Sequence, residues 1–123
     1  MNNKTVILNF KIANCIQLFL GVYINCFKAE YSDESVPSIY KEFRDAVRDA
    51  SNEQLVKYRA DCATGVEVEL KDPVTMATSV ENAQKIAKLF KVGLDLSPTF
   101  SWHDTATQDL EYLQQAITVA TGE

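Results

Sequence analysis

The sequence predicts an all-α protein: a single domain, residues 1–123, in which four or five helices form a compact bundle around an apolar N-terminal helix. Three observations support this prediction. Apolar residues recur at steps of three and four along most of the chain, which is the spacing of one face of a helix. Most of these stretches are bounded by a serine, aspartate, proline or glycine that can begin or end a helix. The composition, with 46% hydrophobic and 24% charged residues, is that of a globular domain with a real core.

The first helix is predicted over Thr5–Tyr31, a stretch with no proline and a single glycine, Gly21. Its apolar positions form two adjacent rows and its polar positions form a narrow stripe, so most of its surface needs cover from other elements. We therefore expect it at the centre of the bundle. The first row is Leu8, Ile12, Cys15, Phe19, Val22 and Cys26, and the second row is Ile16, Leu20, Tyr23 and Phe27.

The same stretch bears on where the protein acts. A cleaved export signal has a positive start, an apolar run and a small residue before the cut, and a cut before Glu30 fits that scheme only in part. Lys28 lies beside this cut, and Phe27 stands where a small side chain is needed. We expect residues 1–29 to be retained in a cytoplasmic protein; an exported protein, periplasmic or secreted, is the alternative. A transmembrane span is not expected, because it needs about 20 nearly continuous apolar residues.

Two helices are predicted between Ser35 and Ala63. Ser35 is the expected N-cap of the second helix, with Pro37 in its first turn, and Ser51 is the expected N-cap of the third. One continuous helix with a kink near Ser51 is the alternative. Charges alternate along this region, which is typical of a solvated helix surface rather than of catalytic carboxylates.

A short extended segment is predicted near residues 66–70, after Gly65, because apolar and acidic residues alternate there. The next helix is expected to begin at Asp72–Pro73 and to end at Gly93. A restart of this helix at the capping sequence around Ser79 is the alternative. We detect no internal repeat. The predicted core positions of this helix are Met76, Val80, Ala83, Ala87 and Phe90.

The last part of the chain is predicted to be a loop, Leu94–Asp104, followed by a final helix capped by Asp104 or Thr105. The loop contains the only tryptophan and the only histidine of the chain. Its aromatic residues have two possible roles, to complete the core or to anchor a partner. The final helix is expected to be buried through Ala106, Leu110, Leu113, Ile117 and Ala120.

Charge and residue types argue against several classes of function. The net charge of -5 and the pI near 4.9 oppose binding to nucleic acid, which needs clustered Lys and Arg. The cysteines, Cys15, Cys26 and Cys62, form no C-x-x-C pair, so we expect buried thiols, no metal site and no cofactor. His103 stands beside a carboxylate but lacks an evident nucleophile, so an enzyme is not favoured.

The sequence therefore favours a small acidic non-enzymatic binding protein, an inhibitor, an immunity protein or a regulatory subunit, that acts by protein–protein contact. After Lys91 the chain has no Lys or Arg, which is typical of a solvated acidic surface; the alternative is a docking face for a basic protein partner. A helical carrier of an apolar small ligand is the second hypothesis, and a minimal enzyme with a site around His103 is the third. A homo-oligomer is compatible with the sequence. The predicted partner-binding residues are Phe100, Trp102, His103, Asp104, Asp109 and Glu111.

Overall fold

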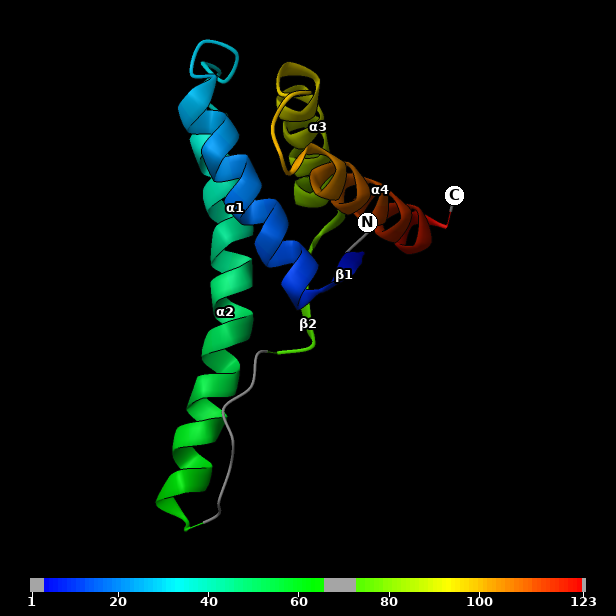
Figure 1. The fold of residues 1–123 in the computed structure, drawn as a ribbon. Helices are drawn as coiled ribbons and strands as arrows, with labels where there is room; N and C mark the ends of the chain where they lie inside the picture. Colours follow the sequence, from blue (N-terminus) through cyan, green and yellow to red (C-terminus); the bar gives the residue numbers. More distant parts are fainter. Residues whose placement is uncertain (1–3, 66–72, 123) are drawn as a thin grey trace.

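The computed structural model describes residues 4–65 and 73–122. These residues form four helices and two short strands (Figure 1), which confirms the predicted helical domain. The extended segment predicted at 66–70 lies outside the described residues. In chain order the elements are β1 (Thr5–Asn9), α1 (Phe10–Cys26), α2 (Val36–Ala63), β2 (Thr75–Ser79), α3 (Val80–Leu96) and α4 (His103–Thr121).

Residues Thr5–Asn9 form a strand, so the prediction of a helix from Thr5 was wrong at its first residues. Val6 and Leu8 are fully buried, while the other three residues of the strand, Thr5, Ile7 and Asn9, are exposed. This alternation is that of a strand with one face on the core. The Asn9 side chain then accepts a hydrogen bond from the Ile12 backbone N–H at 3.2 Å and caps α1, which therefore begins at Phe10.

The second strand replaces the first turns of the helix predicted from Asp72–Pro73. β2 pairs with β1 in an antiparallel ribbon whose register sets Ile7 opposite Ala77. Met76 and Thr78 are buried and their neighbours in β2 are exposed. The alternative start was the right one: the Ser79 hydroxyl accepts a hydrogen bond from the Asn82 backbone N–H at 3.1 Å and caps α3. The helix continues past Gly93 to Leu96.

The structure contains an internal repeat that the sequence did not show. Two units of strand, helix and helix follow one another, and β2 and α3 have the same lengths as β1 and α1, 5 and 17 residues. Within the strand and the first helix, each residue of the second unit follows its counterpart by 70 positions, as Thr75 follows Thr5 and Val80 follows Phe10. Between the two β–α segments, the only residues that recur unchanged are Thr5, Ala13, Ile16 and Val22, as Thr75, Ala83, Ile86 and Val92.

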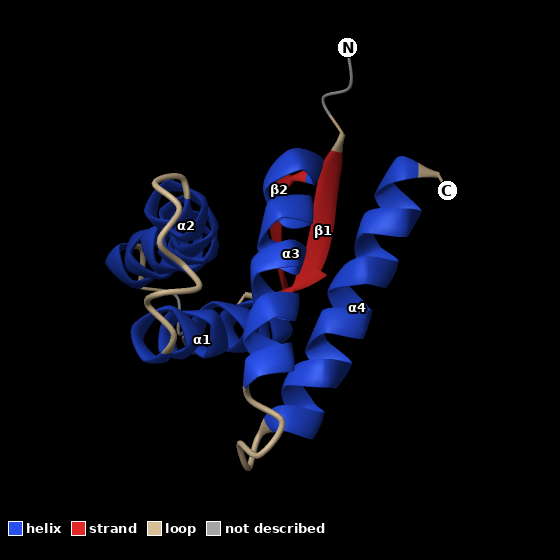
Figure 2. Ribbon diagram, turned by 90° about the horizontal axis from the view of Figure 1, so that it is seen from above, coloured by secondary structure: helices blue, strands red, loops and turns tan. Residues whose placement is uncertain are grey.

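The two units are related by an approximate two-fold axis. Counterparts touch each other where such an axis passes, and two pairs do so: Ile7 faces Ala77 in the ribbon, and the Tyr23 ring lies against Gly93. The second helix of each unit packs beside the strand of the other unit: α2 lies beside β2, and α4 lies beside β1. Figure 2 shows α4 alongside β1, with α3 over the ribbon.

The core lies between α1, α3 and the inner face of the ribbon. Both α1 and α3 contact every other element, so the central place predicted for the first helix is shared by two helices. The buried row of α1 is close to the second of the two predicted rows; in the first row, Val22 and Cys26 are exposed. The buried residues of α1 are Phe10, Ala13, Ile16, Leu20 and Tyr23.

Residues Val36–Ala63 form one continuous helix, α2, so the single helix of the alternative prediction is confirmed and Ser51 caps nothing. Ser35 occupies the N-cap position but makes no capping bond; its backbone N–H and its hydroxyl both donate to Asp33 Oδ1, at 2.7 and 2.6 Å. Val47 is the last buried residue of α2 among those whose side chains are described. The C-terminal half extends well beyond the other helices (Figure 1).

Candidate binding surface

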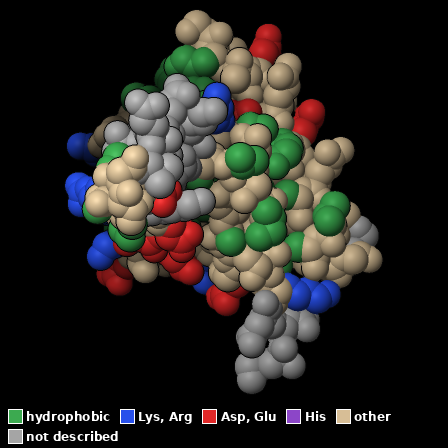
Figure 3. Space-filling model, turned by 90° about the horizontal axis from the view of Figure 1, so that it is seen from below, with side chains coloured by type: hydrophobic (Ala, Val, Ile, Leu, Met, Phe, Trp, Pro, Cys, Tyr) green, Lys and Arg blue, Asp and Glu red, His purple; other side chains and the backbone are tan. Residues whose placement is uncertain are grey.

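The outer face of the ribbon is open to solvent. Because side chains alternate along a strand, the residues between the buried ones point away from the core. Ile7 is central on this face, and its side chain is 57% exposed. Figure 3 views the molecule from below and shows hydrophobic side chains spread over the middle of this side, with a group of acidic side chains beside them. The outward-facing residues are Thr5, Ile7, Asn9, Thr75, Ala77 and Ser79.

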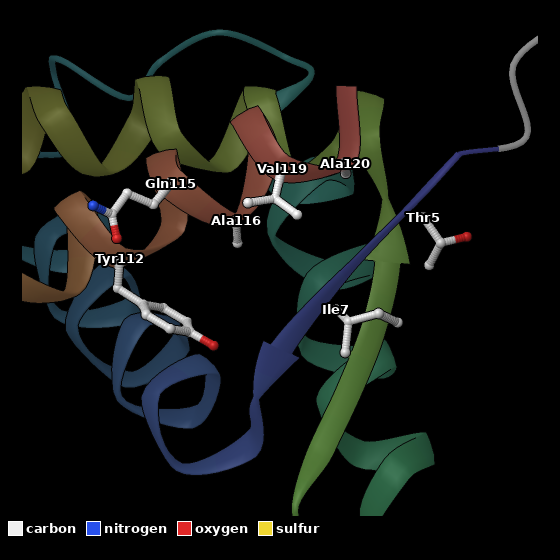
Figure 4. Close-up of a pocket in the computed structure, with 7 residues that line it drawn as sticks. All are labelled: Thr5, Ile7, Tyr112, Gln115, Ala116, Val119 and Ala120. Atoms are coloured by element: carbon white, nitrogen blue, oxygen red, sulfur yellow. The ribbon is translucent and has the colours of Figure 1, made fainter. Parts of the chain in front are cut away.

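A hollow of about 320 Å³ lies between β1 and α4 (Figure 4). Two contacts hold α4 along the strand. At one end, the Asn9 backbone N–H donates to the Tyr112 hydroxyl at 2.8 Å; at the other, the Lys4 ammonium donates to the Thr121 carbonyl at 3.3 Å. Between these contacts the lining is mostly apolar: Thr5, Ile7, Tyr112, Gln115, Ala116, Val119 and Ala120.

A second hollow, of about 330 Å³, lies between β2 and α2 and is the counterpart of the first. Ala46 and Ala50 of α2 precede Ala116 and Ala120 of α4 by the 70 positions of the repeat. The second hollow is more acidic, because Asp49 stands where the first hollow has Val119 and Glu53 also lines it. Ile7 borders both and separates them. The second hollow is lined by Ile7, Ala46, Asp49, Ala50, Glu53, Thr75, Met76 and Ala77.

We name the outer side of the ribbon, with both hollows, the ribbon face. On both of its helices, exposed apolar and acidic side chains line the same shallow depressions. On α4, Glu111 and the 82% exposed Val119 line one shallow depression. On α2, a second shallow depression is lined by Asp49, Glu53 and the 66% exposed Val56. The ribbon face thus has an apolar middle and carboxylates on both flanks.

The aromatic residues predicted to bind a partner lie elsewhere, in a cluster between α1, α3 and the loop before α4. The half-buried Trp102 ring stacks on Phe19, with the centroids 4.5 Å apart and the planes 3° from parallel. Phe100 lies 5.1 Å from Trp102 and 6.0 Å from Phe27, centroid to centroid. Stacked contacts of this kind favour the role in which the loop completes the core.

The predicted acidic residues do not form one face. Asp104 and Glu111 are exposed and lie on the same side of α4, two turns apart. Asp109 points about 140° away from Asp104 around the helix and is half-buried. Neither Asp104 nor Thr105 caps α4: the N-cap position belongs to Trp102, and Asp104 lies in the first turn. His103, half-buried, is the first residue of the helix.

Asp109 faces α1 rather than solvent. One of its carboxylate oxygens, Oδ2, is buried and has no hydrogen-bond partner among the residues that the structure describes. Burial raises the pKa of this carboxyl above its ordinary value. Burial also raises the pKa of the Cys15 thiol, and the negative charge of Asp109 adds to the increase. A thiol with a raised pKa is a poor nucleophile, so this pair has the character of a packing contact.

We expect Asp109→Asn to raise the melting temperature at pH 7. A carboxyl whose pKa is raised in the fold is ionised only at a cost, so stability falls as the pH rises from its ordinary value, about 3.9, through the folded value. The gain from the amide should therefore vanish near pH 3. Thermal melts at both pH values test this. Asp104→Asn is the control and should bring no gain, because a charge in the first turn of a helix is favourable; equal melting of Asp109→Asn and wild type at pH 7 would contradict the interpretation.

The cysteines correct another expectation. All three are free, but Cys26 and Cys62 are exposed and only Cys15 is partly buried.

Within residues 4–65 and 73–122, no group of three potential ligands is placed to hold a metal ion. None of the described helices is both long enough and apolar enough to cross a bilayer.

Comparisons of the chain with protein-family models, with curated proteins and with solved structures return no match.

The ribbon face was missed from the sequence because its floor was assigned to helices. The signals that could have revealed it are the alternation around Val6 and Leu8 and the paired alanines of α2 and α4, which recur at 70 positions.

Proposed function

We propose that this chain is a non-enzymatic binding protein that acts by protein–protein contact, and that the ribbon face is its contact surface. Three kinds of observation support the proposal. The face gathers exposed aliphatic side chains, it is hollowed on both sides of Ile7, and it carries carboxylates at both flanks. Exposed apolar patches bordered by polar residues are typical of interaction sites.

The observation that carries the proposal is the exposure of Ile7 and Val119 across one hollow. An antiparallel ribbon with one face on the core usually has polar side chains on its other face, so an exposed isoleucine in the middle of that face is unusual. Here the inner face is covered by the core and the outer face by nothing within the described chain. Binding of a partner would remove this apolar surface from water, which is favourable by roughly 25 cal/mol per Å².

A capture experiment with matched variants tests the proposal. The double variant Ile7→Thr, Val119→Asn removes apolar surface from the ribbon face without adding charge. Its control, Leu18→Asn, Val22→Thr, removes two exposed aliphatic groups from α1, away from the ribbon face. Wild type and control should retain the same protein from an extract, and the ribbon variant should lose it. Equal retention by all three would overturn the proposal.

The carrier hypothesis has its own readout. Native mass spectrometry of the purified protein would show a bound apolar molecule if the hollows hold a small ligand instead. We expect the mass of the bare chain.

A further inference from the structure

Resting on this proposed function, we propose that the ribbon face binds an amphipathic helix whose apolar row is flanked by Lys or Arg. The strand edges, the shape of the floor and the charges at the flanks determine which kind of segment fits this face.

The strand edges argue against an extended partner. Phe10 and Val80 N–H groups bond across the ribbon, to Val74 and Lys4 carbonyls, at 2.9 and 3.4 Å. Along a strand, backbone groups that point toward the paired strand alternate with groups that point away from it. Lys4 and Phe10 point toward the paired strand, so the backbone groups of Thr5, Ile7 and Asn9 point away from β2. α4 lies along that edge and its Tyr112 hydroxyl already accepts from Asn9; α2 lies along the edge of β2. An added strand would have to displace one of these helices.

A helix needs neither edge, because its backbone hydrogen bonds are internal and it offers only side chains to the surface. The floor of the ribbon face is built for such a contact. Its two hollows flank the Ile7 side chain, and each has two alanines on its helical wall. Small wall residues leave room for aliphatic side chains of a partner to enter from above. The partner's apolar row would then straddle Ile7.

The flanks determine the charge of the partner. Asp49 and Glu53 border the hollow at α2, and Glu111 lies one turn before Gln115 in the wall at α4. Carboxylates on both sides complement a helix that has basic residues on either side of its apolar row. The same charges oppose a second copy of this chain, because two ribbon faces brought together would set carboxylates against carboxylates.

Three synthetic peptides of about 14 residues, or four helical turns, test the inference. The first has Leu at helical spacing and Lys elsewhere; the second has the same composition in strict alternation; the third has the helical pattern with Glu in place of Lys. Binding is measured by fluorescence anisotropy, and the site is located by NMR shifts at Ile7 and Val119. We expect the first peptide to bind at least about tenfold more tightly than either of the others.

Two variants sharpen the test. The triple variant Asp49→Asn, Glu53→Gln, Glu111→Gln should weaken binding of the first peptide by about tenfold and flatten its salt dependence, since rim charges act mainly through steering. The Ile7→Thr, Val119→Asn variant should weaken binding with its salt dependence intact.

Each contrary result has a definite meaning. Preference for the alternating peptide would show strand addition, and equal binding of the Lys and Glu peptides would remove the charge argument; either overturns the inference. A dimer in sedimentation that the Ile7→Thr, Val119→Asn variant abolishes would make a second copy the occupant. If no peptide binds while capture still depends on the ribbon face, the helix inference fails and the proposed function stands. If capture fails as well, both fail.

Discussion

Gly93→Ala is expected to lower the free energy of unfolding by about 3 kcal/mol, the upper part of the range for overpacking a core. A Cβ at this position would overlap the ring of Tyr23. Gly93 and Tyr23 are counterparts in the repeat, and they meet where the approximate two-fold axis passes between α1 and α3. A large ring on one helix and no side chain on the other let the two helices approach there.

The Tyr23 ring has no free direction in which to move. It is fully buried, and it packs against Phe90 and Trp102 with centroid distances of 5.6 and 5.1 Å. Side chains in a close-packed interior relax only partly, so the added methyl group must shift α3 itself. This is why we expect the effect to exceed the gain in helix propensity that alanine brings over glycine, about 1 kcal/mol.

Urea denaturation measures the difference, with Gly21→Ala as the matched control. Gly21 is also inside a helix, and its added Cβ would meet only the Tyr40 hydroxyl, at 2.8 Å. Tyr40 is half-buried and its hydroxyl is the far end of a rotatable side chain, so the control should be near neutral. Tyr23→Leu should restore part of the stability that Gly93→Ala loses. Similar stabilities for the two glycine variants would show that the helices do not meet as described.

Helices α2 and α4 were predictable from proline placement and apolar periodicity, although the predicted capping bonds are not formed. Pro37 in the first turn of α2 and the row Ala106, Leu110 and Leu113 in α4 are local features, and both are found in the structure. The strands were not predictable in the same way. Val6 and Leu8 belong to a run whose apolar spacing also suits a helix, and five residues are too few for periodicity to decide. These residues form a strand because they pair with β2, which lies 70 positions further along the chain.

The acidic character of the candidate site could be predicted from the sequence, but the residues that form the site could not. The acidic excess after Lys91 is visible in the sequence, and Glu111 does line the same depression as an exposed apolar residue, Val119. Which carboxylates share a face depends on the packing of α4 against α1, which turns Asp109 inward. The floor of the ribbon face depends on contacts between the two units, and their sequences retain too few identical residues for the repeat to be seen.

Trp102→Ala is expected to lower the free energy of unfolding by about 3 kcal/mol, the lower end of the range for truncating a buried aromatic residue to alanine. The indole stacks on Phe19 and also contacts Tyr23 and Phe100, so its removal leaves a gap among rings that already pack on the core. Trp102→Phe is the control, because a smaller ring retains most of the stacking and should cost less.

The same variant separates the two roles considered for the aromatic loop. Trp102 precedes α4, whereas Val119 lies near its other end, about 25 Å along the helix axis. If the indole completes the core and the ribbon face binds the partner, Trp102→Ala should reduce the melting temperature and leave the dissociation rate of the partner unchanged at temperatures where the variant is folded. A faster dissociation with an unchanged melt would instead make Trp102 an anchor. The contact surface would then extend from the ribbon face to the loop of residues 97–102.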